Sequence, residues 1–150
     1  MADTASQTVY RARIERRFAA SRERVFRAWA SAEALKRWYA PGEATVALAE
    51  VDFRVGGRFL IHMQGPDGTA FRVSGEYREI VPPERLVFTW RWEHEPAEAE
   101  TVVTVEFREN GAETDVILTH DGFASAQAQT GHETGWNGIF EKLAALLSDG

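Results

Sequence analysis

The chain has 150 residues, of which 44% are hydrophobic, and it carries a formal net charge of −6. This length and composition fit one globular domain, which would bury about 70% of its unfolded surface. The acidic balance argues against a nucleic-acid binder, which needs a clustered basic face, and the absence of cysteine excludes disulfides, thiol chemistry and cysteine metal sites.

The beginning of the chain shows no visible secretory signal. Residues 1–7 are small and polar, so we expect a frayed N-terminus followed by a single domain over residues 8–150. A secretory signal would need a basic start and then an apolar core, and neither is present. No apolar run approaches the ~20 residues that a membrane helix requires. We therefore expect a cytoplasmic protein that does not contact the membrane.

The first predicted elements are a strand and two short helices. Apolar and charged residues alternate over Thr8–Phe18, which predicts a half-buried strand. Ser21 is a suitable N-terminal cap for a short helix, and Ser31 is suitable for a second one that ends near Trp38. Pro41–Gly42 follows at once and stops the second helix.

The middle of the chain predicts an antiparallel sheet. Turn-forming residues, such as the segment Gly65–Gly68, separate runs that are β-branched or that alternate apolar with polar residues. Asn110–Gly111 is the preferred pair for a two-residue type I′ hairpin. The expected strands are Ala44–Val51, Phe53–Met63, Thr69–Ile80, Leu86–Trp92, Val103–Phe107 and Asp115–His120.

A long helix is predicted at the C-terminal end, from about Gly131 to Leu147. Thr130 and Glu133 have the spacing of a capping box, and an apolar stripe from Trp136 onward recurs at helical spacing. The large side chains occupy only the second half of this helix, whereas its first half carries glycines. A helix that packs tightly at one end and leaves room at the other indicates a pocket.

These elements predict an α+β fold in which a curved antiparallel sheet wraps around the long C-terminal helix. Consecutive strands joined by short turns form a meander, and one face of it must be covered. The C-terminal helix carries the only long apolar stripe, so we expect it to cover that face, with the two short helices after the first strand closing one end.

The order and spacing of several short segments resemble a known family. The matching segments are Phe18–Ser21, Val25–Trp29, Leu35–Gly42, Asp52–Phe59, Gly65–Gly68, Gly75–Tyr77, Pro82–Leu86, Gly131–His132 and Gly135–Trp136. They resemble the bacterial homologues of the activator of the heat-shock-protein-ninety ATPase (AHSA-type), within the superfamily of START and birch-pollen-allergen-like domains. The resemblance implies a helix-grip fold from Val9 to Leu147, with a cavity that takes lipids, hormones or polyketides in members of the superfamily.

The four histidines of this sequence are candidates for acid–base or metal chemistry. His62, His94, His120 and His132 form neither an H-x-H nor an H-E-x-x-H pattern, so we expect no metal and no other cofactor. The alternation of its strand points His120 inward, and His132 lies near the expected opening of the pocket. This pair could act as a general acid and base, or each histidine could be a hydrogen-bonded packing residue.

Large aromatic side chains give the strongest signal for a binding site. Ligand sites are concave and mostly apolar, with a few polar groups that fix orientation. The alternative is that these rings fill the space themselves and leave a dry core. The predicted ligand-binding residues are Trp38, Phe59, Phe71, Tyr77, Phe88, Trp90, Trp92, His120, His132, Trp136 and Phe140.

The leading hypothesis is that the chain binds a small, largely apolar molecule and is not a catalyst. A second hypothesis is an enzyme of the polyketide cyclase or hydrolase kind, with a pocket histidine as acid or base. The third is an interaction domain that stimulates a chaperone ATPase. The expected partners are a small hydrophobic molecule and, under the third hypothesis, a chaperone, but neither nucleic acid nor membrane; the chain is expected to be a monomer or a homodimer.

Overall fold

The computed structural model of the chain describes residues 10–96 and 99–148. The predicted frayed segment 1–7 lies outside these residues, as do the first two residues of the predicted first strand. The elements are β1 (Tyr10–Phe18), α1 (Arg22–Arg27), α2 (Ala32–Leu35), β2 (Thr45–Val51), β3 (Arg58–Gln64), β4 (Ala70–Val81), β5 (Arg85–Trp92), β6 (Thr101–Asn110), β7 (Glu113–Phe123) and α3 (Ala126–Ser148).

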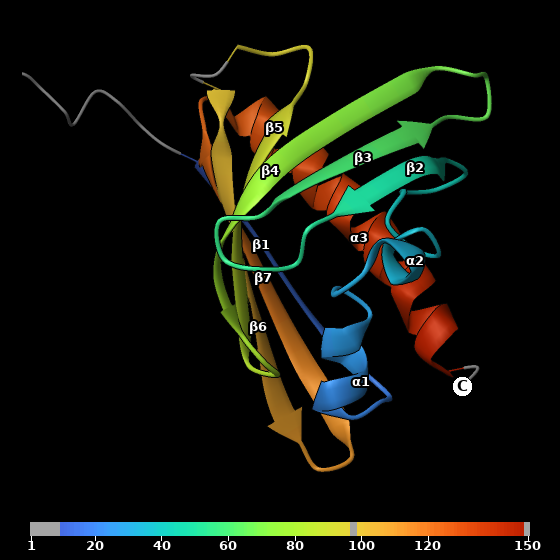
Figure 1. The fold of residues 1–150 in the computed structure, drawn as a ribbon, viewed down its shortest axis with the longest axis vertical. Coiled ribbons are helices and arrows are strands. Elements are labelled where there is room, and N and C mark those ends of the chain that lie inside the picture. Colours follow the sequence, from blue (N-terminus) through green and yellow to red (C-terminus); the bar gives the residue numbers. More distant parts are fainter. Residues whose placement is uncertain (1–9, 97–98, 149–150) are drawn as a thin grey trace, which may run out of the picture.

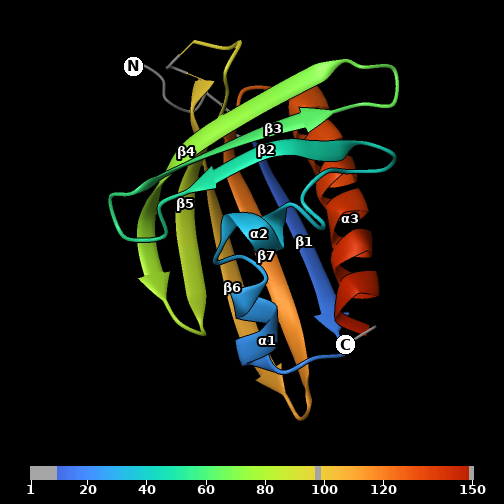
Figure 2. The same cartoon turned by 45° about the vertical axis from the view of Figure 1, so that its right-hand side comes forward.

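Seven antiparallel strands form one sheet in the order β1-β7-β6-β5-β4-β3-β2. From β2 to β7 each strand pairs with the next along the chain, as the meander predicted, and β7 returns to pair with β1. The sheet bends so that β2, β3 and β4 cross over α3, while α1 and α2 occupy the open end (Figures 1 and 2). The helix-grip α+β fold is therefore confirmed.

Helix α3 lies along the edge strand β1 and supplies hydrogen bonds to its unpaired backbone. The Nε2 amide of Gln129 donates to the carbonyl oxygen of Arg11 at 2.9 Å, and the carboxylate of Glu133 accepts from the backbone N–H of Arg13 at 3.3 Å. An open strand edge exposes such groups to pairing with other chains. The helix thus covers one edge of the sheet while its apolar stripe packs into the core.

The start of α3 differs from the prediction. The helix begins at Ala126, not near Gly131, and its cap is Ser125, whose hydroxyl accepts from the backbone N–H of Ala128 at 3.1 Å. The capping box was therefore wrong, because Thr130 lies inside the helix and Glu133 contacts β1. The extra turn is small and polar, so it carries no apolar stripe that would reveal it in the sequence.

Both short helices have the predicted serine caps. The Ser21 hydroxyl accepts from the N–H of Arg24, and the Ser31 hydroxyl accepts from the N–H of Ala34. Helix α2 ends at Leu35, earlier than predicted, and turns continue the chain to the buried Trp38. The indole N–H of Trp38 donates to the carbonyl oxygen of Ala28 at 3.0 Å, which joins the two helices.

Two turns correct the sequence prediction. The predicted strand Phe53–Met63 begins only at Arg58, because residues 52–57 form turns in which Gly56 has a φ of 87°. In the last hairpin Asn110 pairs with Glu113, so the two loop residues are Gly111 and Ala112. Gly111 has a φ of 64°, and no residue other than glycine has a positive φ within the described part of the chain. This is the φ pattern of a type II′ turn and not of the predicted type I′.

The core lies between the concave face of the sheet and the three helices. Alternate residues of β5 and β6 point into it. The buried rings of Phe88 and Phe107 contact Trp29 in the segment after α1, and Trp29 contacts Phe140 of α3. No helix in the two described ranges has the length and hydropathy needed to cross a membrane.

Candidate functional site

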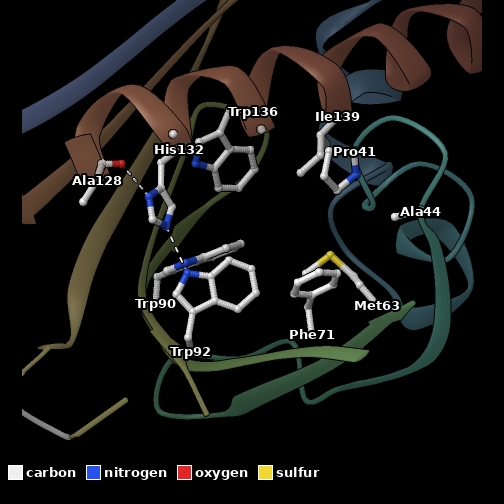
Figure 3. A pocket seen from close by; sticks show the side chains of 12 residues that line it. Pro41, Ala44, Met63, Phe71, Trp90, Trp92, Ala128, His132, Trp136 and Ile139 are labelled. Carbon is white, nitrogen blue, oxygen red and sulfur yellow. Dashed lines mark hydrogen bonds between the residues drawn. The ribbon is translucent and has the colours of Figure 1, made fainter. Parts of the chain in front are cut away.

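A cavity of about 350 Å³ lies between the first half of α3 and strands β3, β4 and β5. Its wall is made of apolar and ring-bearing side chains together with two glycines of the helix. In Figure 3 the side chains of α3 face those of the sheet across the cavity, and the segment before β2 closes one end. The lining residues are Pro41, Ala44, Met63, Phe71, Trp90, Trp92, Ala128, Gly131, His132, Gly135, Trp136 and Ile139.

Small residues on one face of α3 make room for the cavity. Ala128, Gly131 and Gly135 recur at helical spacing along this face, and Ile139 ends the row with a large side chain. Beyond it, Phe140, Leu143 and Leu147 are buried against the rest of the core. The helix is therefore bare where it lines the cavity and bulky where it packs, as the uneven stripe in the sequence indicated.

Two contacts hold the segment before β2 against α3 at the end of the cavity. The ammonium group of Lys142 donates to the carbonyl oxygen of Ala44 at 2.7 Å, and partial burial of this amine lowers its pKa. Pro41 packs beside Gly138 of the helix. These contacts position Pro41 and Ala44 as a wall of the cavity, a role that depends on tertiary packing.

His132 lines the cavity, and both of its ring nitrogens are hydrogen-bonded. The indole N–H of Trp92 donates to Nε2 at 3.0 Å, and Nδ1 lies 2.8 Å from the carbonyl oxygen of Ala128 (Figure 3). A carbonyl oxygen can only accept, so Nδ1 carries the proton and Nε2 is the acceptor. The two partners therefore fix the neutral tautomer with its proton on Nδ1.

His120 lies one layer behind the cavity wall and is fully buried. Its Nδ1 accepts from the indole N–H of Trp136 at 3.0 Å, and its Nε2 lies 2.7 Å from the hydroxyl of Thr101. That hydroxyl donates to the carbonyl oxygen of Trp90, so it accepts from Nε2–H. Burial, and secondarily the nearby His132, lowers the pKa of His120 well below its usual range.

The two histidines therefore offer no free ring nitrogen to a bound molecule. Their rings lie 5.2 Å apart, but each nitrogen is already paired within the chain. A general base needs a lone pair within hydrogen-bond reach of the proton that it removes. As arranged, His120 holds Trp136 and His132 holds Trp92 in the cavity wall.

The structure brings five of the predicted ligand-binding residues to the cavity and leaves six away from it. The five are Phe71, Trp90, Trp92, His132 and Trp136. Of the others, Phe59, Tyr77 and Phe88 surround a residual space of only about 10 Å³, so they fill the core, and burial raises the pKa of Tyr77. Trp38 and Phe140 pack in the core, and His120 supports Trp136 from behind.

The sequence reasoning missed several lining residues. Pro41 and Ala44 carry no signal, because a loop residue becomes a wall only through the packing just described. Met63 alternates inward with Ile61 on β3, and Ala128 belongs to the helical turn that was not predicted. Ile139 was predicted only as part of the apolar stripe.

Among the residues that the structure describes, no charged side chain lines the cavity, and the exposed ring of Phe71 is part of its wall. Within residues 10–96 and 99–148, no group of three or more histidine or acidic side chains has the arrangement of a metal site. The chemistry that this wall can supply is therefore apolar contact, together with the faces and edges of its rings.

Comparisons with known proteins agree with this architecture. Residues 19–148 match the family described as Activator of Hsp90 ATPase homolog 1-like protein. No curated protein matches the chain. Among solved structures, it is similar to the AHSA1 protein from Silicibacter pomeroyi, with 30% identity, a TM-score of 0.80 and coverage of 93% of this chain and 98% of that chain.

Two further solved structures are similar over nearly their whole length. A protein from Chromobacterium violaceum has 28% identity and a TM-score of 0.83, over 91% of this chain and 96% of that one. A protein from Rhizobium loti has 32% identity and a TM-score of 0.77, over 92% and 96%. Proteins of this fold family commonly bind hydrophobic ligands. Because the family match spans most of the chain, the protein belongs to the Activator of Hsp90 ATPase homolog 1-like family.

Proposed function

We propose that this protein binds a small, uncharged and largely apolar molecule in the cavity between α3 and strands β3 to β5. The observation that carries the proposal is the cavity of about 350 Å³, which has no charged side chain on its wall. Small-molecule sites in proteins have volumes of about 300–1,000 Å³ and mostly apolar linings. Because His132 and Trp92 are hydrogen-bonded to each other, the wall favours ligands that need few polar partners.

Burial of apolar surface would be the driving force. A ligand that loses about 300 Å² of apolar surface to the cavity gains about 7.5 kcal/mol at 25 cal/mol per Å². Loss of translational and rotational freedom offsets part of this gain. We therefore expect dissociation constants of about 10 μM or weaker.

The proposal is tested with a panel of neutral hydrophobic compounds, read out by thermal unfolding and by energy transfer from tryptophan to a fluorescent ligand. A compound present at about 100 times its Kd stabilises the folded state by about 2.7 kcal/mol. Ala128→Phe would fill the cavity from α3 and abolish this stabilisation. Ala145→Phe, the same change on the exposed face of that helix, serves as the control. If no compound in the panel stabilises the protein in a saturable manner, the proposal is wrong.

The other two hypotheses have less support. An acid–base enzyme would need a free ring nitrogen on His120 or His132, and all four nitrogens are paired. Stimulation of a chaperone ATPase is suggested by the description of the family alone. Four large apolar side chains stand exposed in the described part of the chain: Leu48 on β2, Val55 in the turn before β3, and Phe71 and Val81 at the two ends of β4.

A further inference from the structure

For two glycines on the cavity wall, the described part of the chain offers no steric explanation. Gly131 and Gly135 lie one helical turn apart on α3, and a Cβ atom added to either would meet no atom within 4 Å. Gly138 differs, because a Cβ atom there would lie 3.4 Å from the Cβ of Pro41 and 3.4 Å from the backbone nitrogen of Gly42. Close packing therefore explains Gly138 but neither of the other two.

The backbone gives no explanation either. Both positions lie within α3, and neither has the positive φ that favours glycine. In a helix interior glycine is less stable than alanine, because it loses more conformational freedom on folding. Alanine would thus fit at Gly131 and Gly135 and stabilise the helix. The chain forgoes this stability at two neighbouring positions that share one property, an open side toward the cavity.

The opposite wall shows what the open side faces. In Figure 3, Trp92, Phe71 and Met63 lie across the cavity from α3. The helix contributes bare backbone on one side, while the sheet contributes two rings and a thioether on the other. The peptide groups of the helix interior are bonded to each other, so the bare side presents little unpaired polarity. The space between the walls is suited to a flat molecule.

We propose that Gly131 and Gly135 form a floor on which a flat, ring-bearing, uncharged ligand lies, so that their missing side chains set the thickness of ligand that the cavity accepts. This inference rests on the proposed function and names the ligand class. Glycine allows a ligand to approach a backbone closely, and aromatic rings prefer offset or edge-on contact with other rings. A methyl group on the floor would hold such a ligand away from Trp92 and Phe71.

The test compares Gly131→Ala and Gly135→Ala with the wild type. Both changes are expected to raise Tm by about 3 °C, because alanine is the better helix former. Both should weaken the binding of the neutral fluorescent probe N-phenyl-1-naphthylamine by about tenfold, since overpacking costs about 1–3 kcal/mol. The flexible chain of 1-decanol can bend around a methyl group, so its binding, measured by competition, should change less.

Thr134→Ala is the matched control, because it introduces the same residue on the exposed side of the same helix. It should leave the binding of both probes unchanged. If the two glycine variants are more stable but bind N-phenyl-1-naphthylamine like the wild type, the inference fails while the proposed function stands. If they are less stable, the positions are not open and the inference fails as well. If the wild type binds 1-decanol or another compound of the panel but not N-phenyl-1-naphthylamine, the inference fails while the proposed function stands. If it binds no compound of the panel, both fail.

Discussion

Replacing His120 distinguishes a histidine that holds the cavity wall from one that performs chemistry. His120→Ala removes a fully buried ring and leaves the indole N–H of Trp136 without its acceptor, whereas the hydroxyl of Thr101 keeps its bond to the carbonyl oxygen of Trp90. Emptying a buried aromatic position costs about 3–5 kcal/mol, and the one buried donor left unpaired adds about 1–3 kcal/mol. Because such terms do not simply add, we expect a loss of about 4–6 kcal/mol in the free energy of unfolding.

His120→Asn keeps part of the arrangement, because its side-chain oxygen can accept from Trp136 in place of Nδ1. It should therefore be about 2 kcal/mol more stable than His120→Ala. Urea unfolding followed by tryptophan fluorescence and circular dichroism measures both variants. At a typical slope of about 2 kcal/mol per M, the midpoint of His120→Ala falls by about 2–3 M. His62→Ala, outside the cavity wall, is the control. If His120→Ala costs less than 1 kcal/mol, as a surface change does, the structural role assigned to His120 is refuted.

Two further predictions follow from buried groups. Because burial lowers the pKa of His120 in the folded state, the unfolded chain binds a proton that the folded chain does not as the pH falls below about 6.5, so stability decreases on acidification. The loss of stability reaches about 2 kcal/mol at pH 5 if the folded-state pKa lies below that pH, and urea titrations between pH 7 and 5 measure it. His120→Asn should remove this pH dependence. An unchanged pH dependence in that variant would contradict the assignment to His120. Gly75→Ala should prevent folding or lower the free energy of unfolding by more than about 3 kcal/mol. The added Cβ atom would overlap the carbonyl oxygen of Thr89 and lie 2.6 Å from the ring of Phe59. A soluble variant with an unchanged circular dichroism spectrum and an unchanged urea midpoint would show that β4 and β5 do not approach this closely.

The sequence predicts the elements well because each depends on local periodicity. Only a strand buries the large side chains that alternate from Leu86 to Trp92, and only a helix buries the apolar stripe after Trp136. The ends of the elements are harder to predict, because neighbouring residues compete for the same capping position. Ser125 and Thr130 are both acceptable caps, and the choice of Ser125 becomes visible only once Glu133 is seen to bond to β1.

Only the helix wall of the cavity could be predicted from the sequence. The glycines of α3 indicated where space is left, whereas the facing wall combines Pro41, Met63 and Phe71 from three separate segments. Aromatic residues do not separate a cavity wall from a filled core, because both need large apolar side chains. Phe59 and Phe88 therefore have the same sequence pattern as Trp90, although they surround almost no free space.

The central claim is that the hollow beside α3 receives an apolar molecule. The most direct measurement is a titration of the ¹⁵N-labelled protein with N-phenyl-1-naphthylamine, observed through its backbone amides and tryptophan indoles. We predict saturable shifts at the indoles of Trp92 and Trp136 and at the amides of Gly131 and Gly135, with the indole of Trp38 unchanged. Shifts that are scattered over the surface, or that do not saturate, would contradict the claim.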